Sequence, residues 1–457
     1  MGAPSVNLRT LITRLSKKID KVALSNSALF IVPSLATTLA SFILFYLLRG
    51  FDAGKLNTLA VILMSSVILS LVTTACIQFV VYRVVGEASL SKERLTARSS
   101  VSRAIALGVI SSVVFSVVVS ALSFPYFKYV LDFSTTQFSY FAILLILYSI
   151  IWILTAAFWA SARYKYPALI YTISYCAVFI LSYLMYRLNP GYTIYGYITG
   201  IAILLTLLSL ASWSVFKGGE QPKKLKLLEA PLALPKVISK DYWGMLFQTF
   251  YIIAIFLDKI IVWVSEGAKA GNGLQFLGPY TTGAFLGLVP TFSVVALAHF
   301  SEKIKPLSKD MYQGTLSEMR ARIEEYKRLY RRGLLVMLTI GLILLILVIG
   351  FSVYFIGDTK VLMIALTIAT GILFFEVILY DSFVLPIFGK NYISVVSIMV
   401  VCFGEALTVP FVSNDIWYAS MGFLGGSFIG FLISHSQATR LLSEFDYNAF
   451  RAFQASS

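Results

Sequence analysis

The chain has little of what most enzymes use. Its 457 residues include only two histidines, His299 and His435, and three cysteines, and charged residues make up 13% of the total. It contains no GxxxxGKS or GxxxxGKT phosphate loop, no HExxH zinc helix and no GxSxG turn around a nucleophilic serine. Metal-dependent and histidine-based catalysis are therefore poorly provided for. The sequence predicts a protein that is not an enzyme and that needs no cofactor and no metal.

Long apolar runs fill most of the chain instead. Hydrophobic residues make up 58% of the sequence, and the mean hydropathy is +0.83. A hydrocarbon core of roughly 30 Å is crossed by about 20 helical residues, whereas a barrel strand needs only about ten alternating ones, so the runs predict membrane-spanning helices. Twelve spans are predicted near residues 26–48, 58–83, 102–123, 138–162, 166–187, 193–216, 241–264, 279–300, 334–356, 361–386, 392–412 and 416–436.

Basic residues alternate between the gaps that separate these spans. With the N-terminus in the cytoplasm, 30 of the 37 Lys and Arg residues lie on the inner side and six on the outer side, while Lys259 falls inside a span. This bias predicts a multi-pass protein of the cytoplasmic (inner) membrane with both termini inside. The net charge of +15 is then mainly a signal of topology. It calls for no nucleic-acid partner and favours contact with anionic membrane lipids.

The pattern predicts an all-α membrane protein built from two six-helix bundles. A basic, amphipathic segment at the start suits a helix in the membrane interface, or else a basic tail. A helical pattern in the longest inner loop suits either a docking surface for a cytoplasmic partner or a connecting helix packed on the membrane face. The predicted units are an interfacial helix (1–25), a first bundle (26–216), a linker (217–240), a second bundle (241–436) with the cytoplasmic helical loop 301–333, and a tail (437–457).

Ionisable residues inside membrane spans are costly and indicate functional sites. All of them away from span ends lie in the second half, and with one tryptophan they form the candidate substrate pathway: Asp258, Lys259, Trp263, Glu376, Asp381 and Glu405. Structural bridges to other helices, or a lysine reaching the outer surface, would explain the same residues. Adjacent helical residues diverge by about 100°, so Asp258 and Lys259 are not expected to pair with each other. Glu376 and Asp381, roughly 140° apart, are not expected to share a site.

Several stretches resemble one known family. The run DYWGMLFQTFYIIAIFLDKIIVWVSEG, from Asp241 to Gly267, is similar to the seventh span of the PelG family, the multispanning component of Pel exopolysaccharide export. Its most specific part is the DKxxxW element, here Asp258, Lys259 and Trp263. The stretches NLRTLI, RYKYPALI, SEMRARIEEYKRLYRRGLL and SEFDYNAF agree in order and spacing. That family is in turn similar to the multidrug, oligosaccharidyl-lipid and polysaccharide exporter superfamily.

The resemblance implies a fold, a substrate and partners. It implies two six-helix bundles around a central cavity, a partly deacetylated aminosugar polymer as substrate, and a cytoplasmic glycosyltransferase with other membrane subunits as partners. The resulting hypothesis is a flippase-like exporter that moves a polysaccharide or lipid-linked glycan by alternating access or through a gated cavity. An ion-coupled antiporter of small amphipathic molecules and a non-transporting scaffold for the glycosyltransferase remain as alternatives.

Overall fold

The computed structural model describes residues 53–90, 94–216, 233–270, 278–294, 296–297, 300 and 316–445. All regular elements in this part of the chain are helical. Ten of the described helices are long and apolar enough to cross a membrane. The predicted interfacial helix (1–25) and first span (26–48) lie outside the described residues.

The first group of helices forms a bundle around α5. Its members are α3 (Ala53–Leu90), α4 (Arg94–Tyr129), α5 (Thr135–Ala160), α6 (Lys165–Leu188) and α7 (Thr193–Phe216). We call this group the N-bundle. Helix α5 packs against α3, α4 and α7, and it is the most buried of them. Its start is fixed by a capping box, in which the Ser134 hydroxyl accepts from the Gln137 backbone N–H and the Gln137 side chain accepts from the Ser134 N–H.

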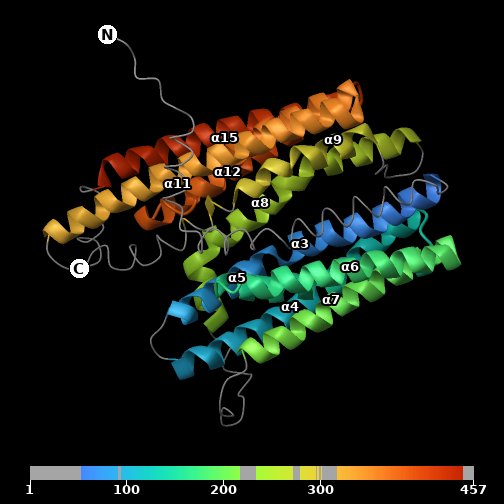
Figure 1. The fold of residues 1–457 in the computed structure, drawn as a ribbon, viewed down its shortest axis with the longest axis horizontal. Helices are drawn as coiled ribbons and strands as arrows, with labels where there is room; N and C mark the ends of the chain where they lie inside the picture. Colours follow the sequence, from blue (N-terminus) through green and yellow to red (C-terminus); the bar gives the residue numbers. More distant parts are fainter. Residues whose placement is uncertain are drawn as a thin grey trace.

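The second group, the C-bundle, follows along the chain. Its longer members are α8 (Ala233–Ala270), α9 (Pro279–Gly287), α11 (Leu316–Phe351), α12 (Thr359–Asp381), α13 (Asn391–Ala406) and α15 (Trp417–Ser443). Short turns lie between them: η4 (Val289–Val294), η5 (Ser352–Ile356), η6 (Leu385–Phe388) and α14 (Val409–Val412). Helix α12 is central, since it packs against α9, α11 and α15. Figure 1 shows the two groups as separate layers, with blue to green helices in one and yellow to red helices in the other.

One predicted span is not a continuous helix, which corrects the expectation for residues 279–300. Helix α9 ends at Gly287, and the chain continues as the 3-10 turn η4. Pro290 explains the break, because it has no backbone N–H and its ring obstructs the preceding helical turn. Before the break, α9 lies directly on α12: a Cβ added to Gly287 would come within 2.7 Å of the Ile368 Cβ. The break therefore redirects the chain while α9 stays in close contact with α12.

The loop predicted at 301–333 and the span after it share one helix. Helix α11 runs without interruption from Leu316 to Phe351. Ile323, Tyr326 and Tyr330, in the half of α11 outside the predicted span, are buried in a cluster that also contains Tyr380 and Phe445. This face of the helix packs on the C-bundle.

The bundles meet along α3 and α8, which lie side by side in Figure 1. The thiol of Cys76 on α3 lies 3.1 Å from the Thr249 hydroxyl and 3.9 Å from the Met245 carbonyl oxygen on α8. One turn away, the Phe79 ring lies over Gly244, where an added Cβ would come within 2.2 Å of the ring. Only a residue without a side chain fits at position 244 in this arrangement. We call these residues of α3 and α8 the bundle contact.

Candidate functional site

Every buried charged residue in the described part of the chain lies in the C-bundle. These residues are Asp258, Lys259, Glu376, Asp381 and Glu405, and each is at most 2% exposed. The buried polar residues of the N-bundle are uncharged, mainly serine, threonine and tyrosine. The predicted candidate residues are thus all inside the protein, and the structure divides the charged ones into three clusters.

The first cluster joins α8 and α9. The Lys259 Nζ lies 2.8 Å from the Asp258 Oδ1 and donates to the Ile255 carbonyl oxygen at 2.6 Å. The Tyr280 hydroxyl donates to the Asp258 Oδ2 at 2.7 Å. The expectation that Asp258 and Lys259 do not pair is wrong. Their Cα–Cβ directions diverge, but the long, flexible lysine chain curls back by one helical turn and brings its ammonium to the carboxylate.

Glu405 on α13 belongs to this first cluster through its nearness to α8. It interacts with the charges of Asp258 and Lys259 and with the Asp258 backbone. The side chain is fully buried, and neither carboxylate oxygen finds a hydrogen-bond partner among the described residues. Its backbone is held close to α15, since a Cβ added to Gly422 would come within 3.1 Å of the Glu405 Cα. A carboxyl group fixed in this way, without a partner, is unusual in a protein interior.

The second cluster lies between α12 and the turn η4. The Ser293 hydroxyl donates to the Glu376 Oε2, while the Glu376 Oε1 has no partner within the described residues. Ser293 reaches α12 because the helix break at Pro290 places η4 beside it. On the other side, the Tyr251 ring of α8 stacks on Phe375 with their centroids 4.8 Å apart.

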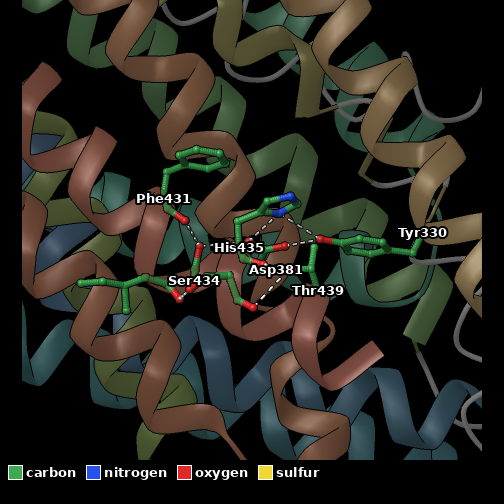
Figure 2. Close-up of polar contacts among 8 residues, drawn as sticks. Tyr330, Asp381, Phe431, Ser434, His435 and Thr439 are labelled. Carbon is green, nitrogen blue, oxygen red and sulfur yellow. Dashed lines mark hydrogen bonds and ion pairs between the residues drawn. The ribbon is translucent and has the colours of Figure 1, made fainter. Parts of the chain in front are cut away.

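The third cluster surrounds Asp381 at the end of α12 (Figure 2). The Tyr330 hydroxyl donates to Asp381 Oδ1 at 2.5 Å, and the Ser434 hydroxyl donates to Asp381 Oδ2 at 2.9 Å. The His435 Nδ1 lies 3.5 Å from the same Oδ2, and its ring stacks on Phe431. The cluster ties α11, α12 and α15 together. Glu376 and Asp381 occupy separate networks, as their helical spacing predicted.

Trp263 connects the first cluster to the N-bundle. Its indole N–H donates to the Thr281 hydroxyl at 2.9 Å, within the C-bundle. Its ring is 4% exposed and belongs to the hydrophobic cluster of the N-bundle. The DKxxxW element therefore supplies an ion pair to one bundle and an aromatic contact to the other.

Sequence reasoning missed the partners of these acids. Tyr330, Ser434, Tyr280 and Ser293 were not among the predicted site residues, although each bonds to one of them. Hydroxyl residues are frequent in membrane helices, so their types give no signal. Pro290 is the one local clue, because a proline inside an apolar run favours irregular backbone, here next to Ser293.

No group of three or more His, Cys, Asp and Glu residues in the described segments is placed to hold a metal ion. The chemistry available to these clusters is proton and charge exchange among carboxyl, phenol, imidazole and ammonium groups.

Comparison with known proteins finds one matching family model and several solved structures with a similar fold. The family model PelG, described as "Putative exopolysaccharide Exporter (EPS-E)", matches residues 7–450. A search of curated proteins found no match.

Solved transporters share the fold. A multidrug resistance MATE family transporter of the MOP superfamily in an outward-facing conformation is 12% identical, with a TM-score of 0.65 over 93% of this chain and 96% of that one. A eukaryotic MATE transporter is 12% identical, with a TM-score of 0.65 over 97% and 99% of the two chains. A MOP superfamily transporter from Pyrococcus furiosus is 10% identical, with a TM-score of 0.62 over 93% and 96%.

Proposed function

Because the chain belongs to the PelG family of exopolysaccharide exporters, we propose that it moves a polysaccharide across the cytoplasmic membrane by rocking of its two bundles. Its many apolar helices make it an integral membrane protein. Both termini lie in the cytoplasm in this proposal, and the chain has twelve spans in total. The proposed substrate is an aminosugar glycan, and the proposed partners are a cytoplasmic glycosyltransferase and further membrane subunits. No chemical step is assigned to the chain itself.

The observation that carries the rocking mechanism is the bundle contact. Each bundle has a buried hydrophobic cluster, the one in the N-bundle including Trp263 of α8, and the side chains of the bundle contact are uncharged. In this contact the Cys76 thiol lies against the Thr249 hydroxyl, and the Phe79 ring lies over Gly244. None of these groups is charged. Such a contact can separate without leaving a buried charge exposed, which suits two bodies that move as units.

The contact also has a defined place in the predicted topology. Helix α3 runs inward and α8 runs outward, so Cys76, Phe79, Gly244 and Thr249 all fall in the inner halves of their spans. We infer that this contact is the inner gate, closed in the present structure. A substrate entering from the cytoplasm would require α3 and α8 to part here.

A reversible cross-link tests the gate. The variant Thr249→Cys, in a background with Cys176→Ala and Cys402→Ala, leaves Cys76 facing a second thiol at the bundle contact. Oxidation should form a disulfide that stops polymer export, and a reductant should restore it. Export is measured as cell-surface or secreted polymer, with protein abundance followed in parallel.

A matched control cross-links two helices of one bundle. Ser116 on α4 and Ser149 on α5 have their hydroxyl oxygens 2.7 Å apart, so Ser116→Cys with Ser149→Cys offers a disulfide inside the N-bundle. In a background without the three native cysteines, this bond should leave export unchanged. Full export with the Cys76 cross-link in place would rule out opening at α3 and α8.

A further inference from the structure

The pair Asp258 and Lys259 satisfies its own charges, which leaves Glu405 as the unbalanced group of the first cluster. Asp258 accepts from Lys259 and Tyr280, and Lys259 also donates to the Ile255 carbonyl oxygen. Neither Glu405 carboxylate oxygen makes a hydrogen bond of regular geometry among the described residues, and the ammonium that it interacts with, Lys259, is already paired with Asp258, although Glu405 is 0% exposed. Two carboxylates beside one ammonium would leave one uncompensated negative charge in an apolar interior, which is strongly unfavourable.

We propose that Glu405 holds an exchangeable proton, and that Lys259 is a built-in cation which makes a bound metal ion unnecessary at this site. The proton neutralises the Glu405 carboxyl while the ammonium neutralises Asp258. Release gives a carboxylate and one free proton, and the lysine lies close enough to interact with both acids. This inference rests on the proposed function only in linking the proton to export, since proton binding itself is a property of the isolated protein.

The surroundings of Glu405 contain few other groups that could take this role. Helix α8 contributes Asp258 and Lys259, α9 contributes the Tyr280 phenol, and Cys402 stands on α13 itself. The facing stretch of α15 is formed by Gly422 and Gly426 and has no titratable side chain at the contact.

The remaining neighbours of α13 also leave Glu405 alone. Helix α14 consists of Val409, Pro410, Phe411 and Val412. The two buried acids of α12 have hydrogen-bond partners elsewhere: Glu376 bonds to Ser293, and Asp381 to Tyr330 and Ser434.

The position of Glu405 gives the proton a short route to the surface. It lies in the last turn of α13, which ends at Ala406. Leu407 and Val409, just beyond, are 57% and 51% exposed. Glu405 therefore lies beside the turn between α13 and α14, where a local opening would give a proton access to the carboxyl.

Infrared spectroscopy of the purified protein tests the protonation directly. The protonated carboxyl of Glu405 should give a C=O stretching band that disappears as the pH is raised. Glu405→Gln should abolish this band, while Glu376→Gln should keep it. Glu405→Gln imitates the neutral acid in shape, so its thermal stability should match the parent protein. Glu376 is also buried, with one oxygen lacking a partner, and can give a second band that Glu405→Gln leaves in place. A spectrum that loses no band in Glu405→Gln would overturn the proposal.

Cation dependence tests the role of Lys259. The parent protein should have the same Tm in sodium, rubidium or choline chloride. Lys259→Met vacates the cation position beside two carboxylates, so sodium should raise its Tm by roughly 2 °C, and the double variant with Glu405→Gln should lose this rise. A sodium-dependent Tm in the parent protein would instead indicate a metal site. If Lys259→Met does not fold, the infrared result decides.

A separate experiment tests whether the Glu405 proton is needed for polymer export. A permanently neutral Glu405→Gln cannot release a proton, so polymer export should fall roughly 10-fold at unchanged protein abundance. Normal export by Glu405→Gln, together with loss of the infrared band, would show a proton site unconnected with export and would overturn the coupling. If the parent chain itself exports no polymer, the proposed function fails while the infrared result for Glu405 still stands.

Discussion

Gly244→Ala should weaken the bundle contact by an amount that the structure sets. The added Cβ would lie 2.2 Å from the Phe79 Cζ and 2.7 Å from its Cε2, whereas carbon atoms pack at about 3.5–4.0 Å. The ring must therefore move by more than 1 Å or the helices must part. Overpacking of this kind costs about 1–3 kcal/mol. Because Phe79 is only half-buried and can turn away, the lower part of that range applies.

A cost of about 1–2 kcal/mol lowers the ratio of closed to open contact by a factor of roughly 5–30. The assay is the rate at which a water-soluble thiol reagent modifies Cys76, in a background with Cys176→Ala and Cys402→Ala, which reports how often α3 and α8 part. Because the closed contact predominates, Gly244→Ala should raise this rate by a similar factor. Gly425→Ala is the matched control, because an added Cβ there meets nothing within 4 Å. Equal rates in the two variants would refute the assignment of Gly244 and Phe79 to the contact.

Three further predictions concern the C-bundle. In a Glu405→Gln background, which removes the second carboxylate near Lys259, Asp258→Ala strands the buried ammonium and should lower the stability by about 3–5 kcal/mol, seen as a lower Tm, with recovery when Lys259→Met is added. A Tm equal to that of Glu405→Gln alone would mean that the ion pair does not form. Gly287→Ala forces a Cβ to within 2.7 Å of Ile368 and 3.0 Å of the Ala365 carbonyl oxygen. It should cost about 1–3 kcal/mol in denaturation, unlike the open site Gly350→Ala. Ser293→Ala removes the hydroxyl bonded to Glu376 and should cost about 1–3 kcal/mol, with Glu376→Leu in the same protein restoring stability if the unpaired carboxyl is the cause.

The length of the apolar runs predicted most of the described helices. A stretch of apolar residues long enough to cross the bilayer has few other stable forms, so α3 to α7 fall where the hydropathy placed them. The residues at which the helices begin and end were less predictable. Helix α11 continues from the polar Leu316 segment into the apolar one because backbone hydrogen bonds carry on where hydropathy changes. Helix α8 begins at Ala233, inside the segment predicted as a linker, for the same reason.

The sequence predicted which charged residues are buried, but it did not predict which side chains they contact. Buried acids stand out in an apolar sequence, and all five charged candidates are indeed buried in the C-bundle. Their assignment to a substrate pathway stays a prediction. The partners of Asp381 come from 51 and 53 residues away, at Tyr330 and Ser434, and no local pattern links them. The ion pair between Asp258 and Lys259 was missed because the angle between two helical residues gives only the directions of their Cα–Cβ bonds. It does not say how far the flexible lysine side chain can bend back toward a neighbour.

Rocking of the bundles is tested most directly by a distance between their outer ends. Tyr129 at the end of α4 and Tyr354 in η5 are 81% and 83% exposed and lie on the predicted outer side of the N-bundle and the C-bundle. Spin labels at Tyr129→Cys and Tyr354→Cys, in a protein without its native cysteines, report this distance by pulsed electron paramagnetic resonance. We expect two distance populations, with Gly244→Ala shifting their ratio by a factor of roughly 5–30 and Gly425→Ala leaving it unchanged. A single narrow distance, the same in both variants, would contradict the account.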